Sequence, residues 1–344
     1  MSTFSQIFPP CPTFTEKSIV DLSTKVYIIT GATAGVGLSL ATMLYSLNAT
    51  VYIGGRSSSS CETAITAVQT SIPTSKGNLK PFVADLSDLT TIKPAVTTFL
   101  SQEHRLDVLF LNAGIMTPPA SSKTTQGYDL ELGVNCLSSF LLVQLLEPTM
   151  ANVARHFCHP NQSIRVVWVS SLLNVGTPDG GVQLDASGVP KQLEGMPNYM
   201  QSKAGVYLLA HEFASRQKST GREDGNGSSA DVIANEASHG NPFGVLHVSL
   251  NPGLMKTELQ RHAPPPMRGI MSAVFKGPKA GAYTELYAGL APGVSSGDYV
   301  IPWGRKGEVP PHVVRSMKGV DGQASVSKRF YEWCEQQVQP FVDA

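Results

Sequence analysis

The chain has 344 residues with 26 basic and 26 acidic side chains, so its formal net charge is zero and only 15% of its residues are charged. A neutral chain without a basic stripe lacks the cation excess that phosphate contacts demand, which excludes nucleic acid and anionic membranes as expected partners. No apolar run approaches the roughly 18 to 20 residues of a membrane helix. Residues 1–23 also lack the basic start and apolar block of a secretion signal. We therefore expect a cytoplasmic protein without an integral membrane segment.

Cysteine and histidine usage points away from disulfides and metals. The five cysteines are scattered, with no Cys-x-x-Cys pair, so a disulfide framework is not expected. The His and Cys residues at 156–159 match no zinc spacing, and we predict no metal site.

Short β-branched runs alternate with longer helical segments from Lys25 onward. The periodicity predicts strands at 25–30, 50–54, 79–83, 106–111, 164–169 and 244–249, and helices at 36–47, 58–71, 87–103, 126–150 and 199–216. Ser87 is the expected N-cap of the helix at 87–103. Because strands that alternate with helices require right-handed crossovers, the pattern predicts an α/β fold: a doubly wound parallel sheet with helices on both faces.

The remaining segments set the expected domain organisation. Residues 1–24 form an N-terminal extension and residues 25–262 the main domain. Within the main domain, residues 218–241 are too polar and glycine-rich to bury much apolar surface, so we predict a mobile insertion there. Residues 263–344 belong to the same domain. They hold an amphipathic run at 267–275, a helix at 280–290 and a strand at 299–301, and are expected to form a small substrate lid over the carboxyl edge of the sheet and a C-terminal segment.

A glycine-rich loop, Thr30-Gly-Ala-Thr-Ala-Gly-Val-Gly37, links the first strand to the first helix. Gly31 permits the tight turn, Gly35 lets the backbone approach a pyrophosphate, and Gly37 allows close packing of helix and strand. A glycine cluster by itself can be a helix start that needs no ligand. Its position after the first strand favours a dinucleotide-binding Rossmann fold, with Gly31, Gly35, Val36 and Gly37 at the cofactor.

The second strand ends in Gly54-Gly55-Arg56, without the acidic residue that would bind an unmodified ribose 2′-hydroxyl. An arginine suits a 2′-phosphate instead. A charge-assisted hydrogen bond of this kind contributes about 1.5 to 3 kcal/mol, enough to favour NADP over NAD by about tenfold or more. The alternative is that Arg56 is a solvated surface cation.

Tyr199 and Lys203 are four residues apart and therefore share one face of the predicted helix. A free phenol ionises near pH 10, and a cation held within about 4 to 6 Å lowers that pKa by favouring the phenolate. Ser171 follows the fifth strand, where its hydroxyl can donate to a substrate carbonyl. A tyrosine and a lysine four residues apart, or a serine after a strand, often occur by chance. Together with the glycine loop they indicate catalysis.

With these motifs the chain resembles the short-chain dehydrogenase/reductase family, over residues 25–257. The motifs fall in the order of that family: the loop 30–37, Asp85-Leu86, Asn112-Ala113-Gly114, Asn135, Ser171, Tyr199 with Lys203, and Pro252-Gly253 with Thr257. Arg56 and its surroundings are similar to the NADP-preferring, retinol-dehydrogenase-like branch, and residues 280–304 to fungal members of that branch.

The resemblance implies a role for each catalytic residue. Tyr199 would be the proton donor or acceptor, and Lys203 would lower its pKa and bind the nicotinamide ribose. Ser171 would position and polarise the carbonyl, and Asn135 would hold a water in the proton relay. The remaining cofactor contacts that the resemblance implies are Asp85 near the adenine, Asn112 and Gly114 beside the cofactor, and Thr257 near the pyrophosphate or carboxamide.

The chain departs from the family pattern at two places near the site. Leu111 stands where an asparagine usually precedes Asn112. The interval from Ser171 to Tyr199 is longer than in many members, so the loop 174–198 shapes the substrate pocket differently. The substrate therefore cannot be carried over from a relative.

The sequence thus predicts an NADP(H)-dependent oxidoreductase that interconverts a ketone or aldehyde with an alcohol on a lipophilic small molecule, in the setting of fungal secondary metabolism. Two alternatives stay open: reduction of a carbon–carbon double bond, and a non-catalytic NADP-binding sensor or scaffold. By analogy with family members, which are often dimers or tetramers, a homo-oligomer is also expected.

Overall fold

The sheet at the centre of the fold has its strands in the order β3-β2-β1-β4-β5-β6-β7-β8. The computed structural model describes residues 3–157, 163–223, 244–256, 275–320 and 322–343. In these ranges the strands are β1 (Val26–Ile29), β2 (Thr50–Gly55), β3 (Asn78–Val83), β4 (Val108–Leu111), β5 (Arg165–Val169), β6 (Leu246–Leu250), β7 (Tyr299–Ile301) and β8 (Arg305–Gly307). Neighbours from β3 to β7 pair in parallel, and β8 is antiparallel to β7. The strand order reverses between β1 and β4, which is where open α/β sheets bind ligands. The prediction of a doubly wound α/β fold is confirmed.

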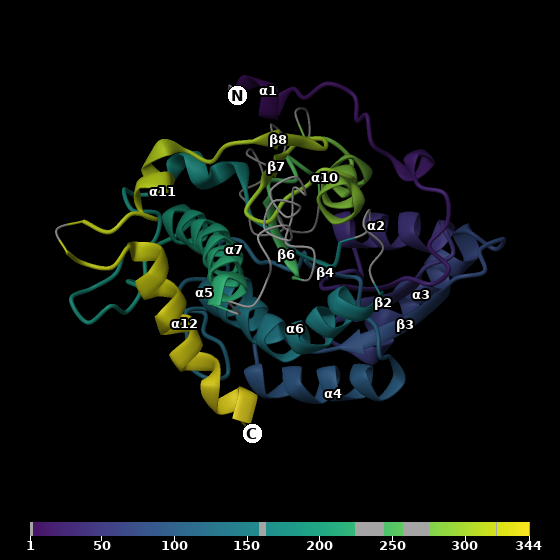
Figure 1. The fold of residues 1–344 in the computed structure, drawn as a ribbon, viewed down its shortest axis with the longest axis horizontal. Coiled ribbons are helices and arrows are strands. Elements are labelled where there is room, and N and C mark those ends of the chain that lie inside the picture. Colours follow the sequence, from purple (N-terminus) through teal and green to yellow (C-terminus); the bar gives the residue numbers. More distant parts are fainter. Residues whose placement is uncertain (1–2, 158–162, 224–243, 257–274, 321, 344) are drawn as a thin grey trace.

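Helices cover both faces of this sheet (Figure 1). One face carries α2 (Gly35–Ser46), α3 (Ser58–Ser71) and α10 (Pro278–Leu290), and the other carries α4 (Ile92–Gln102), α6 (Ser138–Phe157) and α7 (Met196–Glu223). Each face buries its own apolar cluster. In α4, for example, Ile92, Val96 and Phe99 recur at helical spacing, and all three are buried in the cluster of their face.

The helix predicted at 87–103 starts later than expected. Asp88 accepts a hydrogen bond from Thr90 N at 3.1 Å and caps a 3-10 turn, Leu89–Thr91, that leads into α4. Ser87 is therefore not the cap. Its hydroxyl donates to Asp85 Oδ1 at 2.7 Å instead, because the chain has not yet turned into the helix at that point.

Two further helices also differ from their predicted bounds. The helix predicted at 126–150 begins with α5 (Leu130–Leu132), passes through a π-helical turn, η3 (Gly133–Leu137), and continues as α6. Single π turns inside helices are frequent at functional sites. The helix α7 runs to Glu223 and so takes up residues 218–223 of the predicted insertion, while residues 224–241 lie outside the described part of the chain.

The helix predicted at 280–290 is present as α10, but it is not a lid over the carboxyl edge. It packs on the sheet face beside α2, and it comes so close to β4 that a Cβ on Gly289 would lie 2.5 Å from the ring of Phe110. Residues 263–274 of the predicted lid lie outside the described residues. After β8 the chain forms α11 (Pro311–Arg315) and α12 (Val326–Asp343), neither of which we predict from the sequence.

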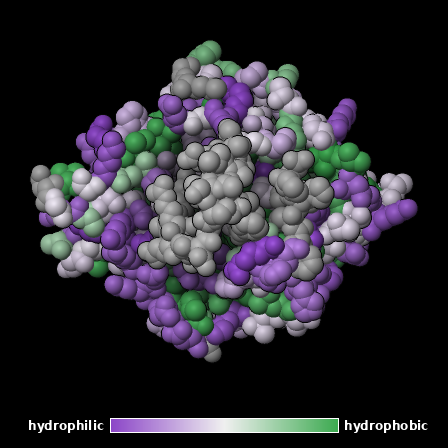
Figure 2. All heavy atoms as spheres, viewed as in Figure 1, coloured by the Kyte–Doolittle hydropathy of each residue, from purple (hydrophilic) through white to green (hydrophobic). Residues whose placement is uncertain are grey.

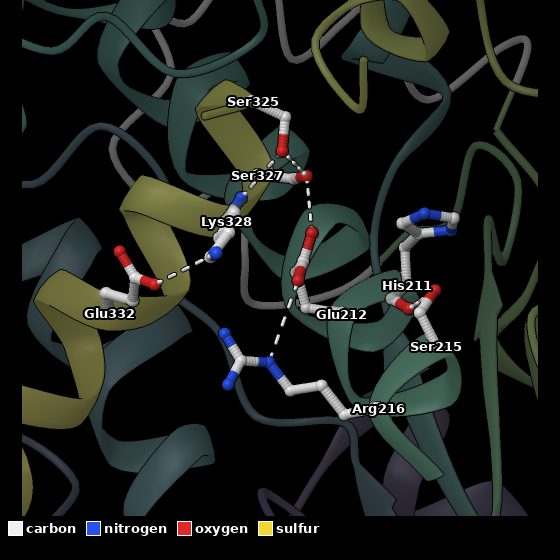
Figure 3. Close-up of polar contacts among 8 residues, drawn as sticks. All are labelled: His211, Glu212, Ser215, Arg216, Ser325, Ser327, Lys328 and Glu332. Atoms are coloured by element: carbon white, nitrogen blue, oxygen red, sulfur yellow. Dashed lines mark hydrogen bonds and ion pairs between the residues drawn. The ribbon is translucent and has the colours of Figure 1, made fainter. Parts of the chain in front are cut away.

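The C-terminal helix α12 lies along α7 (Figure 1) and packs against α6 as well. Figure 3 shows the polar part of this contact: Ser327 Oγ donates to Glu212 at 2.6 Å, and Glu212 also pairs with Arg216 at 3.7 Å. The Arg216 guanidinium lies 3.7 Å from the centre of the Tyr331 ring. On the apolar side, Phe330 is fully buried. α12 therefore braces the helix that carries Tyr199 and Lys203.

The N-terminal extension is ordered against the rest of the fold. It forms α1 (Phe4–Ile7) and a 3-10 turn, η1 (Glu16–Ser18), and α1 lies near β8 in Figure 1. Asn251 Nδ2 donates to Gln6 Oε1 at 3.0 Å, and Arg305 donates to the carbonyl of Ser5 at 2.6 Å. These bonds attach the extension to the edge of the sheet formed by β6–β8.

One helical stretch, Leu130–His156, is long and apolar enough to cross a membrane by length and composition. Of its most apolar 18-residue window, 78% is buried inside the described part of the fold, which is the position of a core helix. Hydrophobic and hydrophilic residues are interspersed on the face drawn in Figure 2, without a continuous apolar band among the coloured residues.

Candidate active site

A cavity of about 810 Å³ lies along the carboxyl edge of the sheet. Residues that follow four neighbouring strands line it: the glycine loop after β1, Arg56 after β2, Asp85 after β3 and Asn112 after β4. Ser171 after β5, together with Tyr199 and Lys203 on α7, lines the same cavity. The structure thus brings together all of the predicted site residues that it describes except two: Gly37 and Asn135 lie just behind the wall.

The glycine loop has the conformation that the sequence predicts. Gly31 and Gly35 have φ angles of +65° and +60°, which favour glycine. A Cβ on Gly37 would lie 2.5 Å from Asn112 Nδ2, so the packing requires glycine at that position too. Asn112 Nδ2 donates to the carbonyls of Thr30 at 2.8 Å and Gly31 at 3.2 Å, and therefore holds the loop in place from β4.

The first turn of α2 fits a bound pyrophosphate. Ala34, at the N-cap, makes no side-chain capping hydrogen bond, and Ala34, Gly35 and Val36 all border the cavity. Amide groups at a helix start, combined with the helix dipole, favour an anion. No acidic side chain occupies the first turn.

The opposite end of the cavity fits the adenosine half of a dinucleotide. Arg56 is exposed at the rim. Asp85 accepts hydrogen bonds from Ser87 N at 3.0 Å and Ser87 Oγ at 2.7 Å, which fix its carboxylate at the end of β3. Arg56 and Asp85 lie at the ends of adjacent strands, as the predicted cofactor contacts require.

Ser171, Tyr199 and Lys203 come from two elements that meet at the end of β5. Ser171 caps a 3-10 turn, η4 (Leu172–Gly176), and its Oγ accepts from Leu173 N at 3.1 Å. Tyr199 and Lys203 lie one turn apart on α7, and both are almost fully buried. Lys203 Nζ donates to the carbonyl of Val169, the last residue of β5, at 2.8 Å.

The pKa of Tyr199 differs from the prediction. Burial raises the pKa of the phenol to about 12, and the negative charge of Glu131 acts in the same direction, whereas a hydrogen bond with Ser171 lowers it. The spacing of Tyr199 and Lys203 predicts a lowered value instead, and the reason for the difference is that desolvation dominates at this buried site. Burial likewise lowers the pKa of Lys203 to about 8.

Asn135 lies in the π-helical turn rather than in a regular helix. Its Oδ1 accepts from Ile115 N at 3.0 Å, and its Nδ2 donates to Ser202 Oγ at 2.9 Å. A Cβ on Gly114 would lie 3.0 Å from Lys203 Nζ and 3.2 Å from Asn135 Oδ1, so a larger residue here would displace these two groups. The π turn thus brings Asn135 into contact with α7.

Two acidic residues of the site do not follow from the sequence reasoning. Glu131, just before the π turn, accepts from Thr117 N at 2.6 Å and from Asn198 Nδ2 at 2.7 Å, and Asn198 directly precedes Tyr199. Glu285 on α10 is fully buried and borders the cavity. No spacing in the sequence marks Glu285, because the buried residues of α10 do not form a single apolar stripe and its burial depends on how the helix packs on the sheet.

Thr257, predicted near the pyrophosphate or carboxamide, lies outside the described residues. Among the described residues, no group of three or more His, Cys, Asp or Glu side chains could hold a metal ion.

Comparison with known proteins identifies the family of the chain. The family model for short chain dehydrogenases matches residues 25–180. A short-chain dehydrogenase/reductase of Phomopsis amygdali is 38% identical over 99% of this chain and 97% of its own length. The short-chain dehydrogenase/reductase pkfC of Emericella nidulans is 35% identical over 96% of this chain and 98% of its own length.

Solved structures share the fold. L-sorbose reductase from Gluconobacter frateurii, in complex with NADPH and L-sorbose, superimposes with a TM-score of 0.57 at 16% identity, covering 81% of this chain and 95% of that chain. At this identity the likeness concerns the fold alone. The identities and coverage of the two fungal relatives reach further: this chain belongs to the short-chain dehydrogenase/reductase family and is an oxidoreductase of fungal type.

Proposed function

We propose that this protein is an NADP(H)-dependent reductase that converts a ketone or aldehyde of a lipophilic small molecule to an alcohol, in fungal secondary metabolism. The observation that carries the proposal is the meeting of Ser171, Tyr199 and Lys203 at one end of a cavity whose other end holds Arg56. The apolar residues Ile115, Met116 and Leu173 line the same cavity and suit a lipophilic substrate.

The residues present fit the cofactor. The uncapped first turn of α2 would hold the pyrophosphate, and Arg56 would pair with the 2′-phosphate. Asp85 would contact the adenosine half, and Lys203 and Tyr199 the nicotinamide ribose. When bound, the dinucleotide supplies the hydride.

The protonation states support the direction of reduction. With a pKa raised to about 12, Tyr199 carries its proton at neutral pH and can donate it to the carbonyl oxygen as that oxygen gains electrons. Ser171 would donate to the same oxygen and stabilise its developing charge. Lys203, with a pKa of about 8, is mostly protonated at pH 7 and would favour the phenolate that remains.

Two alternative functions would have different outcomes in an assay. A reductase of a carbon–carbon double bond would consume NADPH and leave the carbonyl intact. A sensor or scaffold would bind NADPH and turn nothing over. The presence of Ser171, Tyr199 and Lys203 together on one cavity favours an enzyme, because a binding protein has no need of a proton donor beside its ligand.

We further propose a cytoplasmic location and a homo-oligomeric assembly, the latter by analogy with the family. Since α12 packs on α6 and α7, an interface between two copies would use surfaces outside this contact. Size-exclusion chromatography with light scattering tests this: a mass of 36.7 kDa, that of one chain, would contradict it.

A product-resolved assay tests the proposed function. Purified protein is incubated with NADPH and a panel of lipophilic ketones, aldehydes and enones, and the products are identified by mass spectrometry and NMR. We expect alcohols in stoichiometry with the NADPH consumed. Saturated carbonyl products would support double-bond reduction, and tight NADPH binding without any product across the panel would support the sensor.

A further inference from the structure

The side chain of Asn251 joins the N-terminal extension to the wall of the cavity. Asn251 directly follows β6 and is fully buried. Its Nδ2 donates to Gln6 Oε1 on α1 at 3.0 Å, and its Oδ1 accepts from Gly253 N at 2.9 Å. Residues 252–255 border the cavity. One buried amide therefore connects α1 to a loop of the candidate active site, across 245 positions of the sequence.

Gln6 determines which way the Asn251 amide faces. A side-chain amide has a donor end and an acceptor end. Because Gln6 presents its acceptor oxygen, the donor end of Asn251 faces α1, and the acceptor end remains available to hold the N–H of Gly253. Gln6 itself is buried. If position 6 lacked an acceptor, the buried Nδ2 would lose this partner, and the orientation that holds Gly253 would lose its advantage.

A second route leads from α1 to the same loop. Arg305 donates from Nη2 to the carbonyl of Ser5 at 2.6 Å and from Nε to the carbonyl of Pro302 at 2.7 Å. Pro302 lies against Gly253: a Cβ on Gly253 would be 3.1 Å from Pro302 Cγ. Ser5 and Gln6, adjacent in α1, therefore both support the loop after β6.

The strand order places this loop at the catalytic end of the cavity. β6 pairs with β5, the strand that leads to Ser171. β2, the strand that leads to Arg56, is four positions away from β6 in the sheet. Since neighbouring strands lie about 4.8 Å apart, the ends of β2 and β6 are separated by roughly 19 Å. The loop after β6 would thus face the nicotinamide half of a bound dinucleotide and not its adenosine half.

We propose that Gln6 is a positioning residue for the nicotinamide half of the cofactor. Through Asn251 it holds residues 252–255 in the arrangement that binds this half. The proposal rests on the proposed NADP(H) dependence. It assigns the N-terminal extension a part in cofactor binding, although none of its described residues borders the cavity.

Two ligands test the proposal without turnover: NADPH, and adenosine 2′,5′-bisphosphate, which keeps the 2′-phosphate but lacks the nicotinamide and its ribose. Their dissociation constants are measured by calorimetry on the full chain, after circular dichroism has shown that each variant is folded. In Gln6→Leu we expect NADPH to bind about tenfold more weakly, because the cofactor must then hold the loop in place itself. Binding of the bisphosphate should not change.

Further variants make the result specific. Gln6→Glu should restore NADPH binding, because a carboxyl offers an acceptor oxygen in either protonation state. Gln6→Ala removes the amide without adding a branched side chain, and it replaces Gln6→Leu in the comparison if that variant does not fold. Glu16→Gln is the matched control. It disrupts the 3.1 Å ion pair with Lys279 that attaches the same extension to α10, and neither residue borders the cavity, so neither dissociation constant should change.

Other outcomes would overturn the proposal. Unchanged NADPH binding in Gln6→Leu and Gln6→Ala would show that the loop is held without Gln6. Equal weakening of NADPH and the bisphosphate would mean that Gln6 supports the fold as a whole, and weak NADPH binding in Gln6→Glu would exclude the acceptor oxygen as the cause. In all of these cases wild-type protein still binds NADPH. If wild-type protein bound no NADPH at all, the proposed function would fail as well, so the two failures are distinguishable.

Discussion

Lys203 Nζ donates a 2.8 Å hydrogen bond to the carbonyl of Val169, which joins the buried ammonium on α7 to the end of the strand that leads to Ser171. Burial lowers the pKa of Lys203 to about 8 from its ordinary value of 10.5. The folded protein therefore binds fewer protons than the unfolded chain between these two values. The contribution of Lys203 to the free energy of unfolding therefore rises with pH between these two values. Below pH 8, where the buried amine is charged, it destabilises the folded protein most.

Lys203→Met should consequently be more stable than wild type at pH 7, by up to roughly 3 kcal/mol, and the difference should shrink toward pH 10. Urea unfolding of both proteins at pH 7 and pH 10 measures it. Lys76→Met, at an exposed lysine, is the control and should show no such pH dependence. A gain for Lys203→Met that is the same at both pH values would contradict the account.

The contact between α7 and α12 gives a prediction about packing. A Cβ on Gly205 would lie 2.8 Å from the Phe330 ring, so Gly205→Ala should destabilise the protein by about 1 to 3 kcal/mol. In a Phe330→Leu background the same substitution should cost less, because the clash is relieved. Urea unfolding of the four proteins in this cycle measures the coupling. Gly277→Ala, where the added Cβ meets nothing within 4 Å, is the control, and additive effects would contradict the prediction.

Asn198 links Tyr199 to two carboxylates, which predicts a combined effect on stability and rate. Its Nδ2 donates to Glu131 at 2.7 Å and to Asp129 at 2.9 Å. In Asn198→Ala the buried Glu131 loses a donor, so we expect a loss of about 1 to 3 kcal/mol in unfolding free energy and a lower kcat. Gln192→Ala, which removes an exposed hydrogen bond in the same loop, should change neither quantity appreciably. Equal behaviour of the two variants would argue against this role.

We expect Arg56 to determine the preference for NADPH over NADH. Removing the guanidinium in Arg56→Ala should weaken NADPH binding by about tenfold or more and leave NADH binding nearly unchanged, because only NADPH carries the 2′-phosphate. Fluorescence titration with both cofactors measures the ratio, and raised salt should reduce the wild-type preference. If NADPH and NADH weakened equally, Arg56 would not be the residue that reads the phosphate.

Much of the fold could be predicted from the sequence because its signals are local. The helix at Ser58–Ser71 and the strand at Tyr299–Ile301 have their predicted bounds, since serine capping and a β-branched run mark them directly. α12 is not among the predicted helices although its sequence carries the signal: Phe330, Cys334 and Val338 recur at helical spacing and are buried against the rest of the fold. What the sequence could not supply is the partner, since the surfaces of α6 and α7 that α12 covers lie far away along the chain.

The site, too, has residues that the sequence predicts and residues that it does not. The glycine loop and the Tyr199–Lys203 pair were predicted because their chemistry requires fixed spacings along the chain. Glu285 and Glu131 were not, because their importance comes from burial and from partners distant in sequence, which spacing does not report. The pKa of Tyr199 was predicted in the wrong direction for the same reason, since the desolvation that raises it depends on how α7 packs.

The catalytic role of Tyr199 is the central claim, and Tyr199→Phe tests it most directly. The ring is almost fully buried and would be retained, so only the hydroxyl is lost. We expect kcat for NADPH-dependent carbonyl reduction to fall by about 10²- to 10⁴-fold, as the loss of a general acid predicts, while the dissociation constant of NADPH changes little. Carbonyl reduction by Tyr199→Phe at the wild-type rate would contradict the account.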